Sequence, residues 1–376
     1  MVANLESRRI RMQAIPWTNS SAMNDNAFDY TTAFSRNAGW LTAEEQDILR
    51  SKHVAIAGLG GVGGSHLLTL TRLGIGSFTI ADFDTFDLVN FNRQTGAGLS
   101  TLGRKKTTVL ESRARDINPD LNLKILDRGV EESNLDELFS DIDLYVDGLD
   151  FFAVEARRMV FATCHERGIP AITVAPLGMG AALLNFLPGK MNFEEYFQLE
   201  GHSEQEQLLR FLLGLAPAML QSRYLVDPST INLAAHRGPS TPMGCELCAG
   251  VAGTEALKIL LNRGDVIAAP RGMQFDAYHN RVVRTWRPGG NQHPLQRLGL
   301  WLAKKRLLRT STLHSSSGIQ AETAPFDSPM KGILDLARWA PSGDNAQPWR
   351  FEIPDDRHVV IHGYDTREHC VYDLRG

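Results

Sequence analysis

One stretch, residues 53–82, constrains the fold of this chain more than any other. It begins with the apolar run 53–57, continues through a glycine-rich turn and leucines at helical spacing, and ends in a second apolar run closed by Asp82. A strand, a glycine turn, a helix, a strand and an acidic residue follow one another in this order in Rossmann-like nucleotide-binding units. The stretch therefore predicts a buried parallel sheet with a nucleotide site at its edge.

The glycine-rich turn has the composition that a phosphate site requires. Gly58, Gly60, Gly61 and Gly63 carry no side chain, so backbone N–H groups can approach a phosphate. The N-terminus of the following helix favours negative charge at the same place. Asp82 is suited to accept hydrogen bonds from ribose hydroxyls. An NAD-binding oxidoreductase would use the same turn and the same acid.

The residues after Asp82 favour ATP chemistry over hydride transfer. Asp84, Asn92 and Arg93 follow it, and then a Gly-x-x-Lys run that ends at Lys106. A dehydrogenase has no need for these two cations, whereas an enzyme that splits ATP between its α- and β-phosphates does, because charge builds on those oxygens in the transition state. With the glycine loop, the acidic pair and the Asn-Arg-Gln run at 92–94, the chain resembles the ThiF/MoeB family, bacterial relatives of ubiquitin-activating enzymes.

The resemblance covers about residues 30–290 and implies a domain, residues 30–308, that adenylates a carboxylate with ATP and releases pyrophosphate. It implies that the glycine loop, Asp82, Asp84 and Asn92 bind the nucleotide. Arg93 and Lys106 would neutralise the α-phosphate as the carboxylate attacks. The predicted fold is α/β, with a mostly parallel Rossmann-like sheet flanked by helices and an antiparallel C-terminal extension.

Asp150 is the candidate ligand for Mg²⁺. It follows the strand predicted over 142–146, and a carboxylate at the C-terminal end of a parallel strand faces the crevice where ligands bind. An ordinary loop acid or a helix N-cap is the alternative. The chain departs from the family here, because Phe151 and Glu155 stand where the family has Asn and Arg. Arg157 or Arg158 is a candidate replacement for that arginine.

Arg36 lies in a Tyr-x-x-x-x-Ser-Arg run that resembles the family's entry segment. In the family this arginine reaches the ATP of the partner subunit. The resemblance therefore implies a homodimer in which Arg36 completes the partner's active site. The alternative is an ordinary surface arginine.

Cys245 and Cys248 correspond to half of the family's four-cysteine zinc site, and the segment 188–193 that replaces the other half has no cysteine. Structural zinc takes four ligands, so we expect no zinc here. A helix is predicted over 249–261, and two plain thiols at its start are the preferred interpretation. A redox or thiol-acceptor role is the alternative, because helix starts lower thiol pKa values.

The acceptor carboxylate is left open by the sequence. The missing cysteines and a rebuilt region at 191–243 argue against a standard sulfur-carrier partner. A small ubiquitin-like protein, a peptide and a small acid remain as candidates. A non-catalytic nucleotide-binding scaffold is a further alternative to the enzyme.

The ends of the chain differ from the domain in composition. Residues 1–29 are polar and predict a mobile arm, 295–308 a basic helix with a solvated face, and 309–328 a linker. Residues 329–376 contain an Ala-Pro-Ser…Asn-x-Gln-Pro-Trp run and resemble the start of a nitroreductase-family domain. Only a complete domain of that kind would hold FMN, so we interpret the segment as a short α+β stub of a truncated fusion.

The bulk composition excludes several partners. The net charge of −4 gives no footprint for nucleic acid or an anionic membrane, and no apolar run reaches the ~20 residues of a membrane span. Four cysteines imply no disulfide framework. We expect a cytoplasmic protein.

Overall fold

The computed structural model describes residues 28–233, 235–316, 349–355 and 358–363. The chain divides into two compact units, Met1–Lys305 and Arg306–Gly376, and each is described by itself. The predicted mobile arm, residues 1–29, lies outside the described residues except for its last two positions. In the second unit the structure describes an antiparallel hairpin, β9 (Trp349–Asp355) and β10 (His358–Gly363). The rest of the predicted flavin-domain stub lies outside the described residues.

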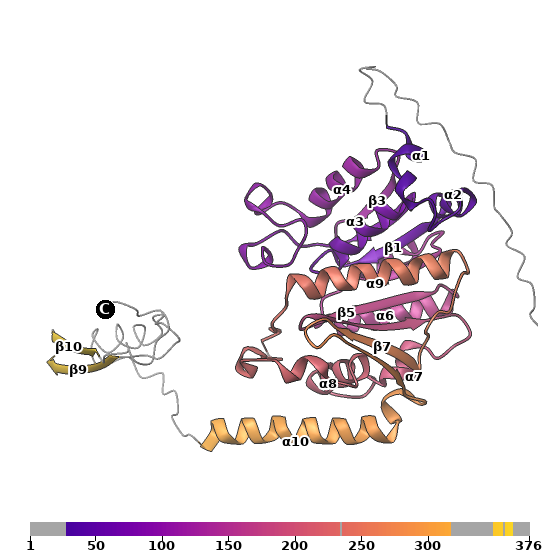
Figure 1. Ribbon diagram of the computed structural model, residues 1–376. Coiled ribbons are helices and arrows are strands. Elements are labelled where there is room, and N and C mark those ends of the chain that lie inside the picture. Colours follow the sequence, from indigo (N-terminus) through magenta and orange to yellow (C-terminus); the bar gives the residue numbers. More distant parts are fainter. Residues whose placement is uncertain (1–27, 234, 317–348, 356–357, 364–376) are drawn as a thin grey trace, which may run out of the picture. The chain divides into compact units, whose positions relative to one another are not determined.

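The first unit is built on an eight-stranded sheet (Figure 1). The strands β3, β2, β1, β4 and β5 are parallel in that order, and β6, β7 and β8 continue the sheet as antiparallel strands. This confirms the predicted α/β fold with its antiparallel C-terminal extension. The bounds are β1 His53–Ala57, β2 Ser77–Ala81, β3 Asn122–Leu126, β4 Leu144–Asp147, β5 Ala171–Leu177, β6 Gly180–Phe186, β7 Arg271–Asp276 and β8 Arg281–Trp286.

Helices cover both faces of this sheet, because the parallel strands are apolar on both sides. In β1, Val54 and Ile56 join a core with α3, α4 and α9, while Ala55 and Ala57 join a second core with α6, α7 and α8. Side chains of a strand alternate between its faces, so these short buried strands serve both layers. The helices are α1 Tyr30–Ala33, α2 Ala43–Ser51, α3 Gly63–Leu73, α4 Lys106–Ile117, α5 Leu135–Leu138, α6 Val154–Glu166, α7 Phe193–Phe197, α8 Glu204–Leu215, α9 Pro242–Leu260 and α10 Pro294–Ser316.

Short 3₁₀ turns occupy several of the connections. They are η1 Ser35–Asn37, η2 Leu88–Asn90, η3 Leu99–Thr101, η4 Glu132–Asn134, η5 Leu220–Arg223, η6 Pro228–Thr230 and η7 Gly290–Gln292. Two of them, η2 and η3, lie in the segment between β2 and α4 that carries the Asn-Arg-Gln run. That segment is therefore structured rather than a loose loop.

Two helices differ in extent from the sequence prediction. The predicted helix 249–261 begins at Pro242, because Thr241 caps it by accepting a hydrogen bond from the N–H of Gly244 at 3.2 Å. Proline suits a first helical position, since its missing N–H would have no helical partner there. The helix α10 continues to Ser316, so residues 309–316 of the predicted linker are helical. Residues 317–328 lie outside the described part of the chain.

In the part of the chain that the structure describes, no helix combines the length and the apolar character that crossing a bilayer requires.

Candidate functional site

The C-terminal ends of β1, β4 and β5 meet at one edge of the sheet, because these strands are parallel neighbours. Gly58 follows β1, residues 148–150 follow β4, and Gly178 follows β5. Ligands of open α/β sheets bind outside this edge. The predicted phosphate loop and the predicted Mg²⁺ ligand therefore lie on the same side of the sheet.

The four predicted loop glycines fall into two pairs. Gly58 has a positive φ of 81°, and a Cβ there would lie 2.3 Å from the carbonyl oxygen of Gly148. A Cβ on Gly63 would lie 1.8 Å from the carbonyl oxygen of Gly58. This pair lets the turn pass against the end of β4, since no side chain fits there.

The second pair is less crowded. A Cβ on Gly60 would meet only the Gln94 amide nitrogen, at 3.8 Å. A Cβ on Gly61 would lie 3.7 Å from the Arg93 Nε and 3.0 Å from the Cys245 Sγ. The loop backbone is therefore uncrowded at Gly60, beside Gln94, whereas Gly61 packs against Cys245 near Arg93. This is the arrangement that a phosphate between the loop and a cation would need.

Asp82 connects the loop to the end of β2. Its carboxylate accepts the N–H of Leu59 at 2.6 Å and the N–H of Asp84 at 2.7 Å. Burial raises the pKa of Asp82, while these two backbone hydrogen bonds and the nearby Lys106 lower it. Each carboxylate oxygen keeps a second lone pair. The group can thus fix the loop and still accept a ribose hydroxyl.

Lys106 is buried at the start of α4, and its Nζ lies 2.9 Å from the Asp84 carboxylate. The Asp84 side chain is about half exposed. Because Asp84 also bonds to Asp82 through its N–H, one chain of contacts runs from the glycine loop to Lys106. The structure brings these predicted residues together.

The Asn-Arg-Gln run supplies the second cation. The Arg93 guanidinium donates to the carbonyl of Val89 at 2.9 Å and to the side-chain oxygen of Asn92 at 3.0 Å. Asn92 in turn donates to the carbonyl of Ser240 at 3.0 Å. Asn92 therefore positions Arg93 and ties this segment to the start of α9.

Gln94 was not singled out from the sequence, yet it is buried against the loop. Its side-chain oxygen has no hydrogen-bond partner among the described residues. A buried amide oxygen without a partner is uncommon in folded proteins. Its place in the Asn-Arg-Gln run was the signal that could have identified it.

Asp150 is exposed at the strand-end edge, and its carboxylate accepts the N–H of Phe152 at 3.0 Å. Beneath it lies a buried ion pair that the sequence prediction did not contain. The Arg157 Nε lies 2.8 Å from the Asp147 carboxylate, and both side chains are 3% exposed. The hydroxyl of Thr173 donates to the same carboxylate at 2.8 Å.

Arg157 holds the loop above it through its remaining donors. It bonds to the carbonyl of Leu149 at 2.7 Å and to that of Asp150 at 3.0 Å. Arg158 pairs instead with Glu194 and Glu155. Neither arginine points a free guanidinium at the site, so the idea that one of them replaces the family's arginine is not supported by these contacts.

Arg36 lies away from the other candidate residues of its own chain. It is exposed in η1, and the neighbouring Asn37 donates to the carbonyl of Leu73, the last residue of α3. The glycine loop lies at the other end of that helix, which is 11 residues or about 16 Å long.

Cys245 and Cys248 are buried within the first two turns of α9. Burial raises the pKa of the Cys245 thiol and places that of Cys248 well above its usual value. Burial thus outweighs the helix start, and the thiol-acceptor alternative loses its physical basis. No group of three or more His, Cys, Asp or Glu that could hold a metal ion occurs among the described residues.

His66 is a further buried group that the sequence did not indicate. It lies on α3, fully buried, and neither ring nitrogen has a partner among the described residues. Burial lowers its pKa to about 4, against the opposing charge of Asp147.

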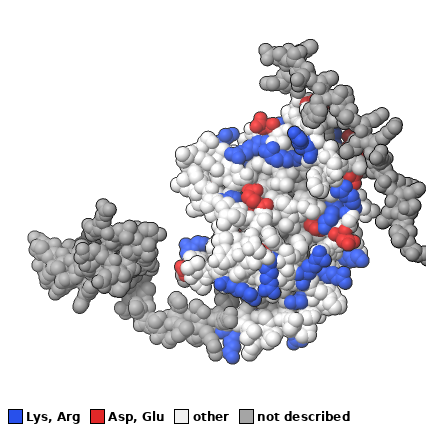
Figure 2. Space-filling view, viewed as in Figure 1, with Lys and Arg blue, Asp and Glu red and all other residues white. Residues whose placement is uncertain are grey.

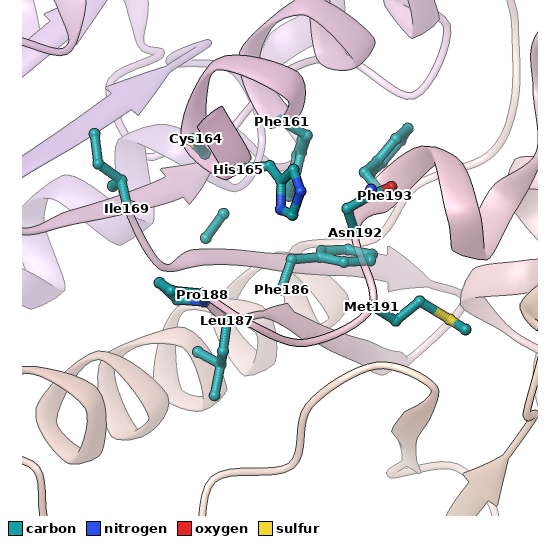
Figure 3. Close-up of a pocket in the computed structure, with 11 residues that line it drawn as sticks. Phe161, Cys164, His165, Ile169, Phe186, Leu187, Pro188, Met191, Asn192 and Phe193 are labelled. Atoms are coloured by element: carbon teal, nitrogen blue, oxygen red, sulfur yellow. The ribbon is translucent and has the colours of Figure 1, made fainter. Parts of the chain in front are cut away.

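A small cavity of about 10 Å³ lies at the ends of β5 and β6 opposite to the nucleotide edge (Figure 3). Ala171 and Phe186, the first residue of β5 and the last of β6, line it together with Phe161 and Cys164 of α6. Its volume fits about one water molecule. This cavity is a packing gap and is separate from the nucleotide edge.

The model of the ThiF family matches residues 34–298. The tRNA threonylcarbamoyladenosine dehydratase of Bacillus subtilis (strain 168) is 34% identical over 150 residues, 40% of this chain and 57% of that protein. The molybdopterin-synthase adenylyltransferase of Escherichia coli (strain K12) is 30% identical over 141 residues, 38% of this chain and 56% of that protein. The chain thus spans a little over half the length of these curated relatives.

Two solved structures show the same fold. The crystal structure of PaaA superimposes with a TM-score of 0.52 at 17% identity, over 70% of this chain and 77% of that one. That of E. coli MccB gives 0.51 at 16% identity, over 70% of each chain. The family match stops at residue 298, so it does not reach the predicted flavin-domain stub. Because the family model matches more than half of the chain, this chain belongs to the ThiF family.

Proposed function

We propose that this protein uses ATP to adenylate a carboxylate. The observation that carries the proposal is the chain of contacts at the sheet edge, from the glycine loop at Leu59 through Asp82 and Asp84 to Lys106, with Arg93 beside Gly61. Two cations beside a glycine loop suit phosphoryl chemistry, and NAD-dependent hydride transfer has no use for them.

In the proposed reaction, a carboxylate oxygen of the acceptor attacks the α-phosphorus of ATP. The bond from that phosphorus to the bridging oxygen of the β-phosphate breaks, and pyrophosphate leaves. Arg93 and Lys106 would stabilise the charge that builds on the phosphate oxygens. Asp84 keeps the buried Lys106 paired until the nucleotide is bound. Catalysis would thus consist of positioning and charge neutralisation.

Asp150 is the residue proposed to hold Mg²⁺ with the nucleotide. Mg²⁺ takes oxygen ligands and is commonly bound by one or two carboxylates together with substrate phosphates. The exposed Asp150 carboxylate at the strand-end edge fits that habit. The ion would supply further positive charge to the phosphates.

The partners belong to the proposal as well. Because Arg36 lies far from its own chain's loop, we propose a homodimer in which it reaches the second site. The acceptor class stays broad: a small ubiquitin-like protein, a peptide or a small acid. The relatives are named as an adenylyltransferase and a dehydratase. Identification of the reaction product would therefore show what happens to the activated carboxylate.

The first test is calorimetric binding of ATP·Mg²⁺ and of NAD to one preparation. We expect ATP binding that is lost in Asp82→Ala and weakened in Asp150→Ala, with melting temperatures measured for each variant. A protein that binds NAD but not ATP would favour the oxidoreductase, and a protein that binds neither nucleotide would favour a non-catalytic scaffold. Both outcomes contradict adenylation.

The second test uses pyrophosphate release with candidate acceptors. We expect Arg93→Ala to lower the rate about 10²- to 10³-fold, because it removes one stabilising donor from the transition state. Arg104→Ala is the matched control, since Arg104 is an exposed arginine in the same segment. An equal loss in both variants would argue against a specific role for Arg93.

A further inference from the structure

Charge is unevenly distributed along this chain. Residues 277–305 contain six Lys or Arg residues and no Asp or Glu, although the whole chain has a net charge of −4. The segment includes β8 and the described side chains of α10. Figure 2 shows Lys and Arg side chains over the lower part of the view, where Figure 1 labels β7, α8 and α10. The whole-chain charge hides this local excess.

The β7–β8 hairpin carries three exposed cations. Arg271, Arg281 and Arg284 are exposed, and none of them forms an ion pair with another described residue. On α10, by contrast, Lys304 pairs with Glu206. The hairpin therefore presents cations that lack an anion within the described part of the protein.

Aromatic and cationic side chains share one face of this hairpin. Trp286 pairs across the strands with Arg271, and Arg284 with Met273, so these side chains project to the same side. Val282, Arg284 and Trp286 follow one another on the same face of β8 at intervals of about 7 Å. Val282 is 57% and Trp286 61% exposed. The face thus presents apolar and aromatic surface to solvent on both sides of Arg284.

The turn of the hairpin carries a further exposed aromatic side chain, close to the nucleotide edge. Tyr278 is 58% exposed, and its ring centroid lies 4.5 Å from that of Tyr224. The Tyr224 hydroxyl donates to the Asp276 carboxylate at 2.7 Å and accepts the N–H of Met179 at 2.8 Å. Met179 lies in the turn between β5 and β6, next to Gly178. The aromatic pair is thus fixed at the edge where the glycine loop lies.

We propose that the outer face of the β7–β8 hairpin binds single-stranded nucleic acid. The backbone phosphates would contact Arg271 and Arg284, and bases would stack on Trp286 and Tyr278. Aromatic platforms beside a cationic groove are the usual means of binding a single strand. The proposal concerns binding alone and does not depend on adenylation.

The residue types favour this ligand over other anions. All three unpaired cations are arginines, which bind phosphate in a bidentate way and also stack on planar rings. An acidic peptide would neutralise them but would give the two exposed rings no matching planar partner. A membrane would have to take up Val282 and Trp286 with Arg284 between them on the same strand face.

The test is fluorescence anisotropy with a labelled 20-nucleotide RNA of mixed sequence and a DNA of the same sequence, at several salt concentrations. We expect the logarithm of the association constant to fall linearly with the logarithm of the salt concentration. Arg284→Ala should lower that slope by about 0.7, the value for one phosphate contact to a single strand. Trp286→Leu should weaken binding roughly 5- to 100-fold with little change in slope.

Arg72→Ala is the matched control, because Arg72 is an exposed arginine at the C-terminus of α3, and it should bind like the unmodified protein. The relative affinities of the RNA and DNA decide which nucleic acid is preferred. Three results would overturn the proposal: no salt-dependent binding of either strand, equal effects of Arg72→Ala and Arg284→Ala, or binding only to phosphatidylserine vesicles or to poly-glutamate.

Discussion

At the scale of single residues, two aspartates three positions apart have opposite environments. Asp147 is buried against Arg157, whereas Asp150 is exposed above it. The sequence indicated the importance of this strand end, since a strand followed by acids is visible in it. It could not indicate which acid is buried, because that depends on Arg157 reaching back from α6. The buried pair supports the loop that presents Asp150, through bonds to the carbonyls of Leu149 and Asp150.

His66 leads to a prediction about pH. Its pKa of about 4 in the folded protein lies below the value of about 6.5 in an unfolded chain, because burial disfavours the charged ring. Above pH 6.5 both states are neutral at this residue. Between pH 6.5 and 4 only the unfolded chain binds the proton, so stability falls as the pH falls. We expect this group to account for a loss of about 3 kcal/mol by pH 4.

Urea unfolding at several pH values measures this loss. His66→Leu removes the titrating group and keeps an apolar side chain in the core, so its stability should fall less between pH 6.5 and 4. If the variant and the parent protein lose the same free energy over that range, His66 does not control the acid response.

At the scale of secondary-structure elements, the sequence predicts best where local signals and burial agree. The strand at 53–57, the glycine turn and the strand before Asp82 occur where expected. The helix α9 begins at Pro242, seven residues before the predicted start at 249, because the Thr-Pro pair at 241–242 forms its N-terminus. This error placed Cys245 and Cys248 before a helix, although they lie inside it and face the core.

The two pairs of loop glycines lead to a second prediction. Gly58→Ala should lower the free energy of unfolding by about 2–5 kcal/mol, because of its positive φ and the carbonyl oxygen 2.3 Å from the new Cβ. Gly60→Ala should change it by about 0.5 kcal/mol or less, since its Cβ would meet only Gln94 at 3.8 Å.

The Gly60→Ala variant, which should fold with nearly normal stability, should instead be impaired in nucleotide binding. We expect Gly60→Ala to weaken ATP binding about tenfold or more, because its methyl group would stand where a phosphate approaches the backbone. Denaturant unfolding and calorimetry on both variants separate the two effects. A Gly60→Ala protein that binds ATP normally would show that phosphate does not approach the loop at this point.

At the scale of the whole molecule, the sequence predicts the sheet, but not the contacts that position the candidate site residues. The spacing that resembles the family makes candidates of Arg93, Lys106, Asp82 and Asp84. The contacts that position them come from distant segments, such as Ser240 beside Asn92, 148 positions along the chain. Such pairs depend on how the helices pack over the sheet, and no local pattern in the sequence encodes them.

The proposed dimer allows a complementation experiment. Arg36→Ala and Arg93→Ala should each be inactive alone if Arg36 acts on the partner's nucleotide. In a mixed dimer, one of the two sites then has both arginines. After random exchange of subunits we therefore expect about a quarter of the unmodified activity. No recovery from a mixture with verified exchange would contradict a role for Arg36 in the partner's site.

The position of β8 at the end of the sheet has a consequence for solubility. An edge strand offers unpaired backbone groups to any other strand, and a second molecule could extend the sheet there. Arg281 and Arg284 oppose this, because two such edges side by side would bring like charges close together. The protection is electrostatic, so it weakens as the Debye length shrinks from about 10 Å at 0.1 M salt to about 3 Å at 1 M. Concentrated salt should therefore favour aggregation through this edge.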